Sequence, residues 1–240
     1  MKKTLFALSA FIFAFAASAQ GSDAATGKQL FDSEHYAKAL PYIKKAAAAG
    51  DIDSQVRLAY MTFTGNEVEM DREAAYEMLD KCIAKGSAYA MSQRAIFMLM
   101  DARNDQERAQ AVDWFKKAAD AGDADAAVYM VNCLRNERNN NMSSAEEAVK
   151  YCRAAAKAGH MEGMAWMGVY TFRGDGGVIK NESEGIQLIE QAYAKSKKNS
   201  FEKNCYEAAK ILQDFYSKNG ETAKANAIRI AIKKYHPEKL

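Results

Sequence analysis

The pattern of apolar and polar positions after residue 20 is helical throughout. Apolar residues recur at helical spacing from Asp53 to Phe63, and a second helical segment opens at Asp71 and ends before Gly86. The short stretch Gly65-Asn66-Glu67 separates the two segments. No strand-length run of alternating β-branched residues follows residue 20. The pattern therefore predicts pairs of helices joined by loops.

The end of the second helix in each pair recurs at a fixed distance. The octapeptide KKAAAAGD at residues 44–51 returns as KKAADAGD at residues 116–123. Four glycines close alanine-rich segments of this kind, and their separations are 36, 36 and 37 residues: Gly50, Gly86, Gly122 and Gly159. A constant period of this length is typical of a solenoid, in which each unit buries its apolar face against its neighbours.

This repeat predicts the fold class and the organisation of the chain. We expect an all-α protein, a right-handed α-solenoid of about six stacked helix-turn-helix units. Residues 20–50 should form an N-terminal capping hairpin and residues 198–240 a C-terminal capping helix pair, because a terminal unit has one face without a neighbour. Four repeats lie between these caps, at residues 51–86, 87–122, 123–159 and 160–197.

Local signals place several helix ends. Asparagines at residues 139–141 predict a loop, and Ser143 or Ser144 followed by acidic residues predicts the N-cap of the next helix. Pro41 is expected in the first turn of its helix, where the missing N–H costs little.

Small residues recur at one position of the first helices, where neighbouring helices should approach closely. The residues at this position are Ala59, Ala95, Val131 and Gly168. A large side chain there should force the units apart, so Gly168→Leu should lower the thermal midpoint through overpacking.

The N-terminal residues form a separate element. Met1-Lys2-Lys3 precede a short apolar run, and Ala17-Ser18-Ala19 supplies a small-x-small cleavage site, which predicts a signal peptide at residues 1–19. The apolar run is shorter than the roughly 20 residues that a membrane-spanning helix needs, and a retained anchor is the alternative. The mature chain should begin at Gln20 after cleavage near Ala19 and be exported, either to the periplasm or out of the cell.

The charge of the mature chain narrows the classes of partner. Removing residues 1–19 lowers the number of Lys and Arg from 33 to 31, because Lys2 and Lys3 are lost, and the number of Asp and Glu stays at 31. Nucleic-acid binding requires a basic excess or a basic stripe, and this chain has no such excess. We therefore expect neither nucleic acid nor a membrane surface as the principal partner.

Particular residues resemble a known repeat. The unit from residue 160 carries Gly163, Gly168, Thr171 and Gly174, and residues 114–122 carry the pattern W-x-x-K-A-A-x-x-G. Together these resemble the Sel-one-like repeat, a relative of the tetratricopeptide repeat, over nearly all of the mature chain. The resemblance implies stacked helix pairs that act as scaffolds for other proteins.

The resemblance also implies a binding surface, because the first helices line the concave side of tetratricopeptide-like arrays. Tyr, Phe and Arg side chains dominate binding energy at protein interfaces. Two alternatives stay open: the face is merely solvated, or aromatic residues such as Tyr60 pack between units. The predicted partner-binding groove contains Tyr60, Phe63, Tyr89, Ser92, Asn132, Arg135, Phe172 and Arg173.

The cysteines allow two interpretations. Cysteine-rich members of the resembled family use disulfides to clamp their helix pairs, and Cys133 and Cys152 form the one pair within a single unit. Their predicted heights along the two helices differ by roughly 7 to 9 Å. A disulfide requires Cα atoms within about 7 Å. Buried free thiols are therefore favoured for all four cysteines, and a Cys133–Cys152 disulfide is the alternative.

The sequence offers no residues for catalysis, for a cofactor or for a metal. The histidines are scattered, and the methionines spaced three apart from Met161 are typical of helix packing. We predict a non-enzymatic scaffold or adaptor, favoured as a monomer, that binds a protein or peptide. The alternatives are an immunity or inhibitor protein for an exported toxin and, less favoured, an enzyme of β-lactam or cell-wall chemistry.

Overall fold

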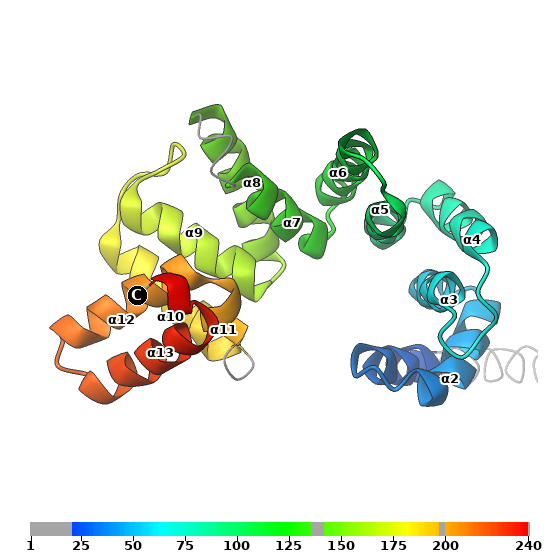
Figure 1. Ribbon diagram of the computed structural model, residues 1–240, viewed down its shortest axis with the longest axis horizontal. Helices are drawn as coiled ribbons and strands as arrows, with labels where there is room; N and C mark the ends of the chain where they lie inside the picture. Colours follow the sequence, from blue (N-terminus) through cyan, green and yellow to red (C-terminus); the bar gives the residue numbers. More distant parts are fainter. Residues whose placement is uncertain (1–20, 136–141, 197–199, 240) are drawn as a thin grey trace, which may run out of the picture. The chain divides into compact units, whose positions relative to one another are not determined.

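The computed structural model describes residues 21–135, 142–196 and 200–239. All regular secondary structure in these residues is helical, which confirms the predicted all-α class (Figure 1). The chain divides into two compact units, unit 1 up to Trp114 and unit 2 from Phe115 onwards. The predicted signal peptide, residues 1–19, and the loop predicted at residues 139–141 lie outside the described residues.

Unit 1 consists of successive helices joined by short loops. Residues 21–32 are helical, and α3 packs against α2, α4 and α5. The first helices of successive pairs therefore lie next to one another, as in an α-solenoid. The helices of unit 1 are α2 (Tyr36–Ala48), α3 (Ile52–Thr64), α4 (Arg72–Ala84), α5 (Ala88–Asp101) and the first part of α6 (Asp105–Asp120).

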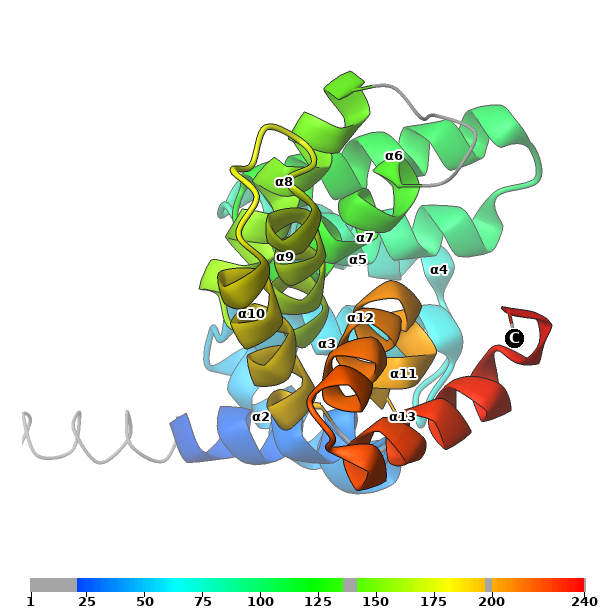
Figure 2. The same ribbon diagram turned by 90° about the vertical axis from the view of Figure 1, so that its left-hand side faces the viewer.

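Unit 2 continues the same architecture. Helices that follow one another in sequence pack together: α8 packs against α7 and α9, and α10 lies beside α9 (Figure 2). The helix α9 also contacts α7 and α12, so it is the central helix of this unit. The elements of unit 2 after α6 are α7 (Ala124–Leu134), α8 (Met142–Lys157), α9 (Met161–Arg173), α10 (Glu182–Lys195), α11 (Ser200–Asn204), α12 (Tyr206–Lys218), α13 (Thr222–Tyr235) and the 3-10 helix η2 (Pro237–Lys239).

The periodic glycines end helices in the way that their spacing predicts. Gly50, Gly86, Gly122 and Gly159 all have left-handed backbone conformations, with φ between +80° and +101°. The N–H of the residue after each glycine donates to the carbonyl five residues back, as Asp51 does to Ala46 at 3.0 Å. This is the Schellman arrangement, which favours glycine because a side chain is strained at positive φ.

The residue after each closing glycine starts the next helix. The side chains of Asp51, Ser87 and Asp123 each accept a hydrogen bond from the backbone N–H three residues later, as expected for N-caps. One three-residue junction therefore ends a helix and begins the next, as residues 49–51 do between α2 and α3. This is why the octapeptide of residues 44–51 is nearly repeated at residues 116–123.

Two predicted helix ends are wrong. Pro41 is an interior residue of α2, which begins at Tyr36, so the proline removes an N–H that would otherwise bond within the helix. Glu34, two residues before the start of this helix, has a left-handed φ of 60°. Ser143 and Ser144 lie inside the first turn of α8, which begins at Met142, and neither is its N-cap.

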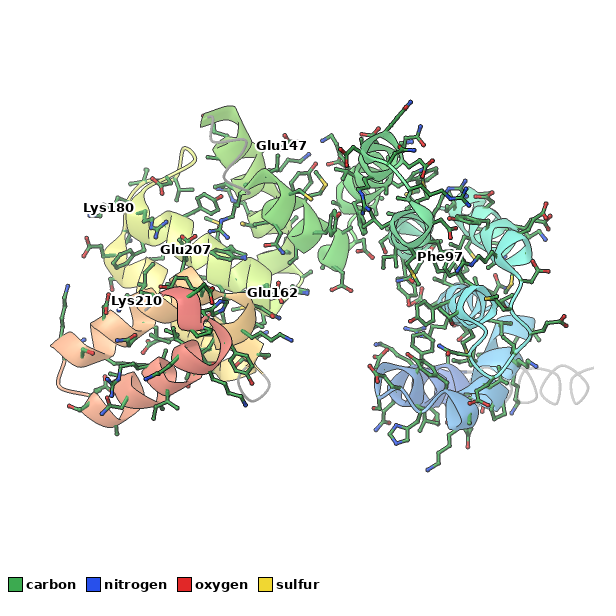
Figure 3. The ribbon with its side chains drawn as sticks, viewed as in Figure 1. Phe97, Glu147, Glu162, Lys180, Glu207 and Lys210 are labelled. Carbon is green, nitrogen blue, oxygen red and sulfur yellow. The ribbon has the colours of Figure 1, made fainter. Side chains whose placement is uncertain are left out.

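Aromatic side chains fill the core of unit 1. The rings of Phe63 and Phe97 are stacked with their centroids 3.9 Å apart, and both residues are buried. Phe97 lies among the helices of unit 1 in Figure 3. Val56, Ala59 and Leu79 complete the core between α3, α4 and α5. The small-residue position predicted from the repeat is buried in both units, since Ala59, Ala95 and Val131 have no exposed surface and Gly168 is buried.

Glycines allow the helices of unit 2 to approach closely. A Cβ atom at Gly168 in α9 would lie 2.9 Å from the backbone oxygen of Gly185 in α10. A Cβ atom at Gly163, also in α9, would lie 2.9 Å from the backbone carbon of Ala155 in α8. The position of α9 relative to both neighbours therefore depends on residues without side chains. None of the helices in the described part of the chain is both long enough and apolar enough to cross a membrane.

Candidate functional site

The predicted groove residues of unit 1 lie in three different environments. Phe63 and Ser92 are 1% and 3% exposed, so both belong to the core and present no surface to a partner. Tyr60 is half-buried, and its ring contacts those of Phe31, Tyr36 and Phe97. Tyr60 therefore packs against aromatic residues of neighbouring helices, which is one of the two alternatives to a binding role. Tyr89 is half-buried on α5 and lies beneath an arginine side chain of α3.

The predicted groove residues of unit 2 divide differently. Asn132 is exposed on α7. Phe172 is half-buried, and a Cβ at Gly185 would lie 2.7 Å from Phe172 Cβ, so Phe172 lies where α9 meets α10. Arg135 and Arg173, which are 38 residues apart in sequence, meet at the carboxylate of Glu207. This cluster brings together two of the predicted residues and has a defined geometry.

Glu207 connects the two arginines through both of its oxygens. Arg135 donates from Nη2 to Oε1, and Arg173 donates from Nη1 to Oε2 at 2.7 Å. The guanidinium carbon of Arg135 lies 3.2 Å from the centroid of the Trp166 ring. We call Arg135, Trp166, Tyr170, Arg173 and Glu207 the arginine clamp; its carboxylate lies near α9 and α12 in Figure 3.

The helices place each member of the clamp by simple rules. Trp166, Tyr170 and Arg173 are spaced by four and three residues on α9, which puts them on one face of that helix. Arg135 is the C-cap of α7, which packs on α9. Glu207 lies in the first turn of α12, where the partial positive charge of the helix N-terminus stabilises a carboxylate.

Burial keeps the hydroxyl of one clamp residue, Tyr170, and the neighbouring thiol of Cys152 uncharged. It raises the pKa of the Tyr170 hydroxyl to about 12, although the nearby Arg135 opposes the shift. It also raises the pKa of the Cys152 thiol to about 12. At neutral pH the clamp therefore carries two guanidinium charges and one carboxylate charge, a net excess of one positive charge.

The clamp has hydrogen-bonding capacity beyond its internal contacts. A guanidinium has five N–H donors, and each arginine donates one hydrogen bond to Glu207. The side chain of Arg173 is 46% exposed, so its outward donors reach solvent. A charged, rigid arginine stacked on tryptophan is the type of group that anchors a protein partner, and its excess charge favours a partner with acidic groups.

The structure holds all four cysteines as free thiols. Cys82, Cys152 and Cys205 are buried, and Cys133 is half-buried. The possible disulfide between Cys133 and Cys152 is not formed here. Within residues 21–135, 142–196 and 200–239 there is no group of three or more His, Cys, Asp and Glu side chains that could hold a metal ion.

Three members of the clamp, Trp166, Tyr170 and Glu207, are not among the predicted groove residues. Trp166 could have been found, because it lies one helical turn before Tyr170 and two turns before Arg173 on the same face. Glu207 has no comparable signal, since it is 72 residues from Arg135 and lies in the part of the chain assigned to the C-terminal cap. Its contact with the arginines depends on how α12 packs against α9.

Comparison with known proteins agrees with this architecture. Four segments match the family model described as the Sel1 repeat, at residues 52–87, 89–123, 143–160 and 162–197. The crystal structure of a Sel1 repeat protein from Oxalobacter formigenes superposes with a TM-score of 0.59 at 19% sequence identity, covering 88% of this chain and 84% of that one.

A second solved structure is less similar. It is c5321, described as a protective antigen with an SLR fold in uropathogenic Escherichia coli strains, with a TM-score of 0.36 and 15% identity over 83% of this chain and 57% of that one. A comparison with curated proteins finds no match.

Proposed function

Since this chain belongs to the Sel1 repeat family, whose members generally mediate protein–protein interactions and are typically non-catalytic scaffolds, we propose that it is itself a non-catalytic scaffold or adaptor. It binds a protein or peptide partner on the first-helix face of its repeats. It acts after export, in the periplasm or outside the cell, with cleavage of the signal peptide near Ala19. The family supports the scaffold role, and the N-terminal sequence pattern supports export.

The arginine clamp is the observation that supports this proposal most directly. Arg135 is fixed by Trp166 on one side and by Glu207 on the other, so little side-chain entropy is lost when a partner binds it. Arg173 is more exposed and offers donors beside it. We propose that this surface, with the exposed Asn132 on the adjacent helix, contacts the partner of unit 2.

Site-specific crosslinking tests this proposal. A photo-crosslinking amino acid at position 132 should capture a stoichiometric partner in intact cells, and the partner is then identified by mass spectrometry. Arg135→Ala and Arg173→Ala should each abolish capture. Arg229→Ala is the matched control, because Arg229 is an exposed arginine on α13 of the same unit. Loss of capture in the control, or retention in both clamp variants, would place the interface elsewhere.

Glu207→Gln separates the two roles that the clamp could have. If the arginines bind acidic groups of the partner, the variant frees both guanidinium groups and retains or strengthens capture. If capture is lost, Glu207 itself contacts the partner. Capture of a single protein that is an exported toxin would favour the immunity role. Turnover of a β-lactam by the purified protein would contradict the non-catalytic assignment.

Export has its own test. Fractionation of cells followed by N-terminal sequencing should recover the protein outside the cytoplasm with Gln20 at its N-terminus. Recovery of the intact N-terminus in the membrane fraction would instead support a retained anchor.

A further inference from the structure

Arg57 is a buried arginine without a counter-ion. It lies on α3, and the residue is only 6% exposed. Among the described residues it forms no ion pair, and its buried Nε atom has no hydrogen-bond acceptor. Asp53, four residues earlier on α3, is exposed and lies beyond ion-pair distance. The guanidinium lies over the ring of Tyr89 on α5, whose centroid is 5.4 Å from Cζ.

Two other arginines of unit 1 show what is missing. Arg72 lies over the Phe63 ring at 4.8 Å and forms an ion pair with Asp101. Arg94 lies over the Trp114 ring at 4.9 Å and forms an ion pair with Asp80. All three arginines lie over aromatic rings, and the Nε atom of Arg94 is also buried without an acceptor. Arg57, the most buried of the three, is the one without an ion pair to a described carboxylate.

An unpaired guanidinium at this depth is unfavourable in the free protein. Burial limits the contact of the charge with water and leaves Nε without an acceptor, and the attraction of an aromatic ring replaces only part of the lost hydration. Ser54, three residues earlier on α3, is 1% exposed, and its hydroxyl also lacks a partner. Buried polar groups without partners are rare in folded proteins, and an absent bound species is one physical explanation for them.

We propose that Arg57 is a binding site for a carboxylate group supplied by the protein or peptide partner. A guanidinium binds a carboxylate through two parallel hydrogen bonds, and the Arg57 guanidinium lies beside the Tyr89 ring. The site lies on the first-helix layer of unit 1, between α3 and α5. The inference rests on the proposed function and extends it by naming the chemistry of the ligand that unit 1 recognises.

Nuclear magnetic resonance tests the site with small probes and without the partner. The purified protein is titrated while the Arg57 Nε–H signal and the Tyr89 backbone amide signal are followed. N-acetylglutamate α-amide presents a side-chain carboxylate, N-acetylalanine presents a C-terminal carboxylate, and N-acetylglutamine α-amide is the neutral control. The proposal expects saturable shifts with at least one carboxylate probe and at least tenfold weaker binding of the neutral probe. The stronger carboxylate probe identifies the source of the group.

Variants provide the controls. Arg57→Gln should abolish the response of the Tyr89 amide, and Arg57→Lys should weaken binding several-fold because lysine lacks the planar pair of donors. Arg94→Gln, which changes an arginine that already has a carboxylate, should leave the response intact. Equal shifts with sodium chloride at matched ionic strength, or no saturable shift with either carboxylate, would overturn the proposal.

Thermal unfolding gives a second measurement that does not depend on a ligand. If the guanidinium is kept for binding, Arg57→Met should leave the midpoint unchanged or raise it, because an uncompensated buried charge is replaced by an apolar chain of similar length. A lowered midpoint would assign Arg57 to stability and overturn the proposal. The titration and the crosslinking at position 132 are independent, so either can fail while the other succeeds.

Discussion

The close approach of α9 and α10 allows a quantitative prediction. A Cβ at Gly168 would lie 2.7 Å from Cγ1 of Ile189 and 2.9 Å from the backbone oxygen of Gly185. Ordinary contacts between such atoms are about 3.5 Å, so Gly168→Ala must push the helices apart by about 0.6–0.8 Å. Ile189 is fully buried and cannot rotate into free space.

Two opposing effects set the size of the change. Overpacking of this kind costs about 1–3 kcal/mol. Alanine recovers up to about 1 kcal/mol, because it is a better helix former than glycine. We therefore expect Gly168→Ala to lower the free energy of unfolding by about 1–2 kcal/mol and the thermal midpoint by about 2–8 °C. Gly168→Leu should lower both further.

Thermal melts followed by circular dichroism measure a graded series. Gly185→Ala should be the most damaging, because its Cβ would lie 2.6 Å from the backbone nitrogen of Phe172. Gly27→Ala should be mild, since its nearest neighbour would be 3.1 Å away, and Gly21→Ala, with nothing within 4 Å, should be neutral or stabilising. An unchanged or raised midpoint for Gly168→Ala would refute the idea that this glycine sets the helix spacing.

Three further predictions concern charge, thiols and caps. The bond from His160 to Asp125 raises the histidine pKa, so its contribution is complete below the unfolded pKa of about 6.5 and is lost as pH rises through the higher folded pKa. Asp125→Asn should remove this pH dependence in thermal melts recorded below and above that pKa. The bond should contribute less than about 1 kcal/mol to the free energy of unfolding, because Asp125 is largely exposed. A thiol reagent should label Cys133 well before the three buried cysteines, and equal labelling in mass spectra would contradict their burial. Asp51→Ala should cost about 1 kcal/mol in urea unfolding through loss of an N-cap, whereas Asp51→Asn should be nearly silent.

The repeat junctions could be predicted because their signals are local. Gly86 and Ser87 determine a left-handed turn and an N-cap through their own backbone and side chain, so spacing alone places them. The failure at Pro41 has the opposite character. The helix there begins after a left-handed Glu34, and its N-cap, His35, forms no side-chain cap hydrogen bond. The sequence therefore contains no N-cap signal for the start of this helix.

The candidate site was predictable only in part, because helical periodicity does not distinguish a solvent face from a face covered by the next helix. Tyr60, Phe63 and Ser92 all lie on first helices, yet Phe63 and Ser92 are enclosed and Tyr60 is half enclosed. Arg135 and Arg173 lie in a polar environment because both form ion pairs with Glu207 of α12. That meeting depends on tertiary packing between distant segments, which a period of 36 residues does not encode.

The packing of first helices against one another buries arginine side chains in both units. Within each unit first helices pack against one another, as α3 does against α5 and α7 against α9, so a long side chain between them loses contact with water. In unit 2 the guanidinium of Arg135 is compensated within the chain by Glu207. In unit 1 no described carboxylate reaches Arg57. A residue that stays buried and uncompensated weakens the free fold, so its presence is best explained by a bound state in which the missing carboxylate comes from another molecule.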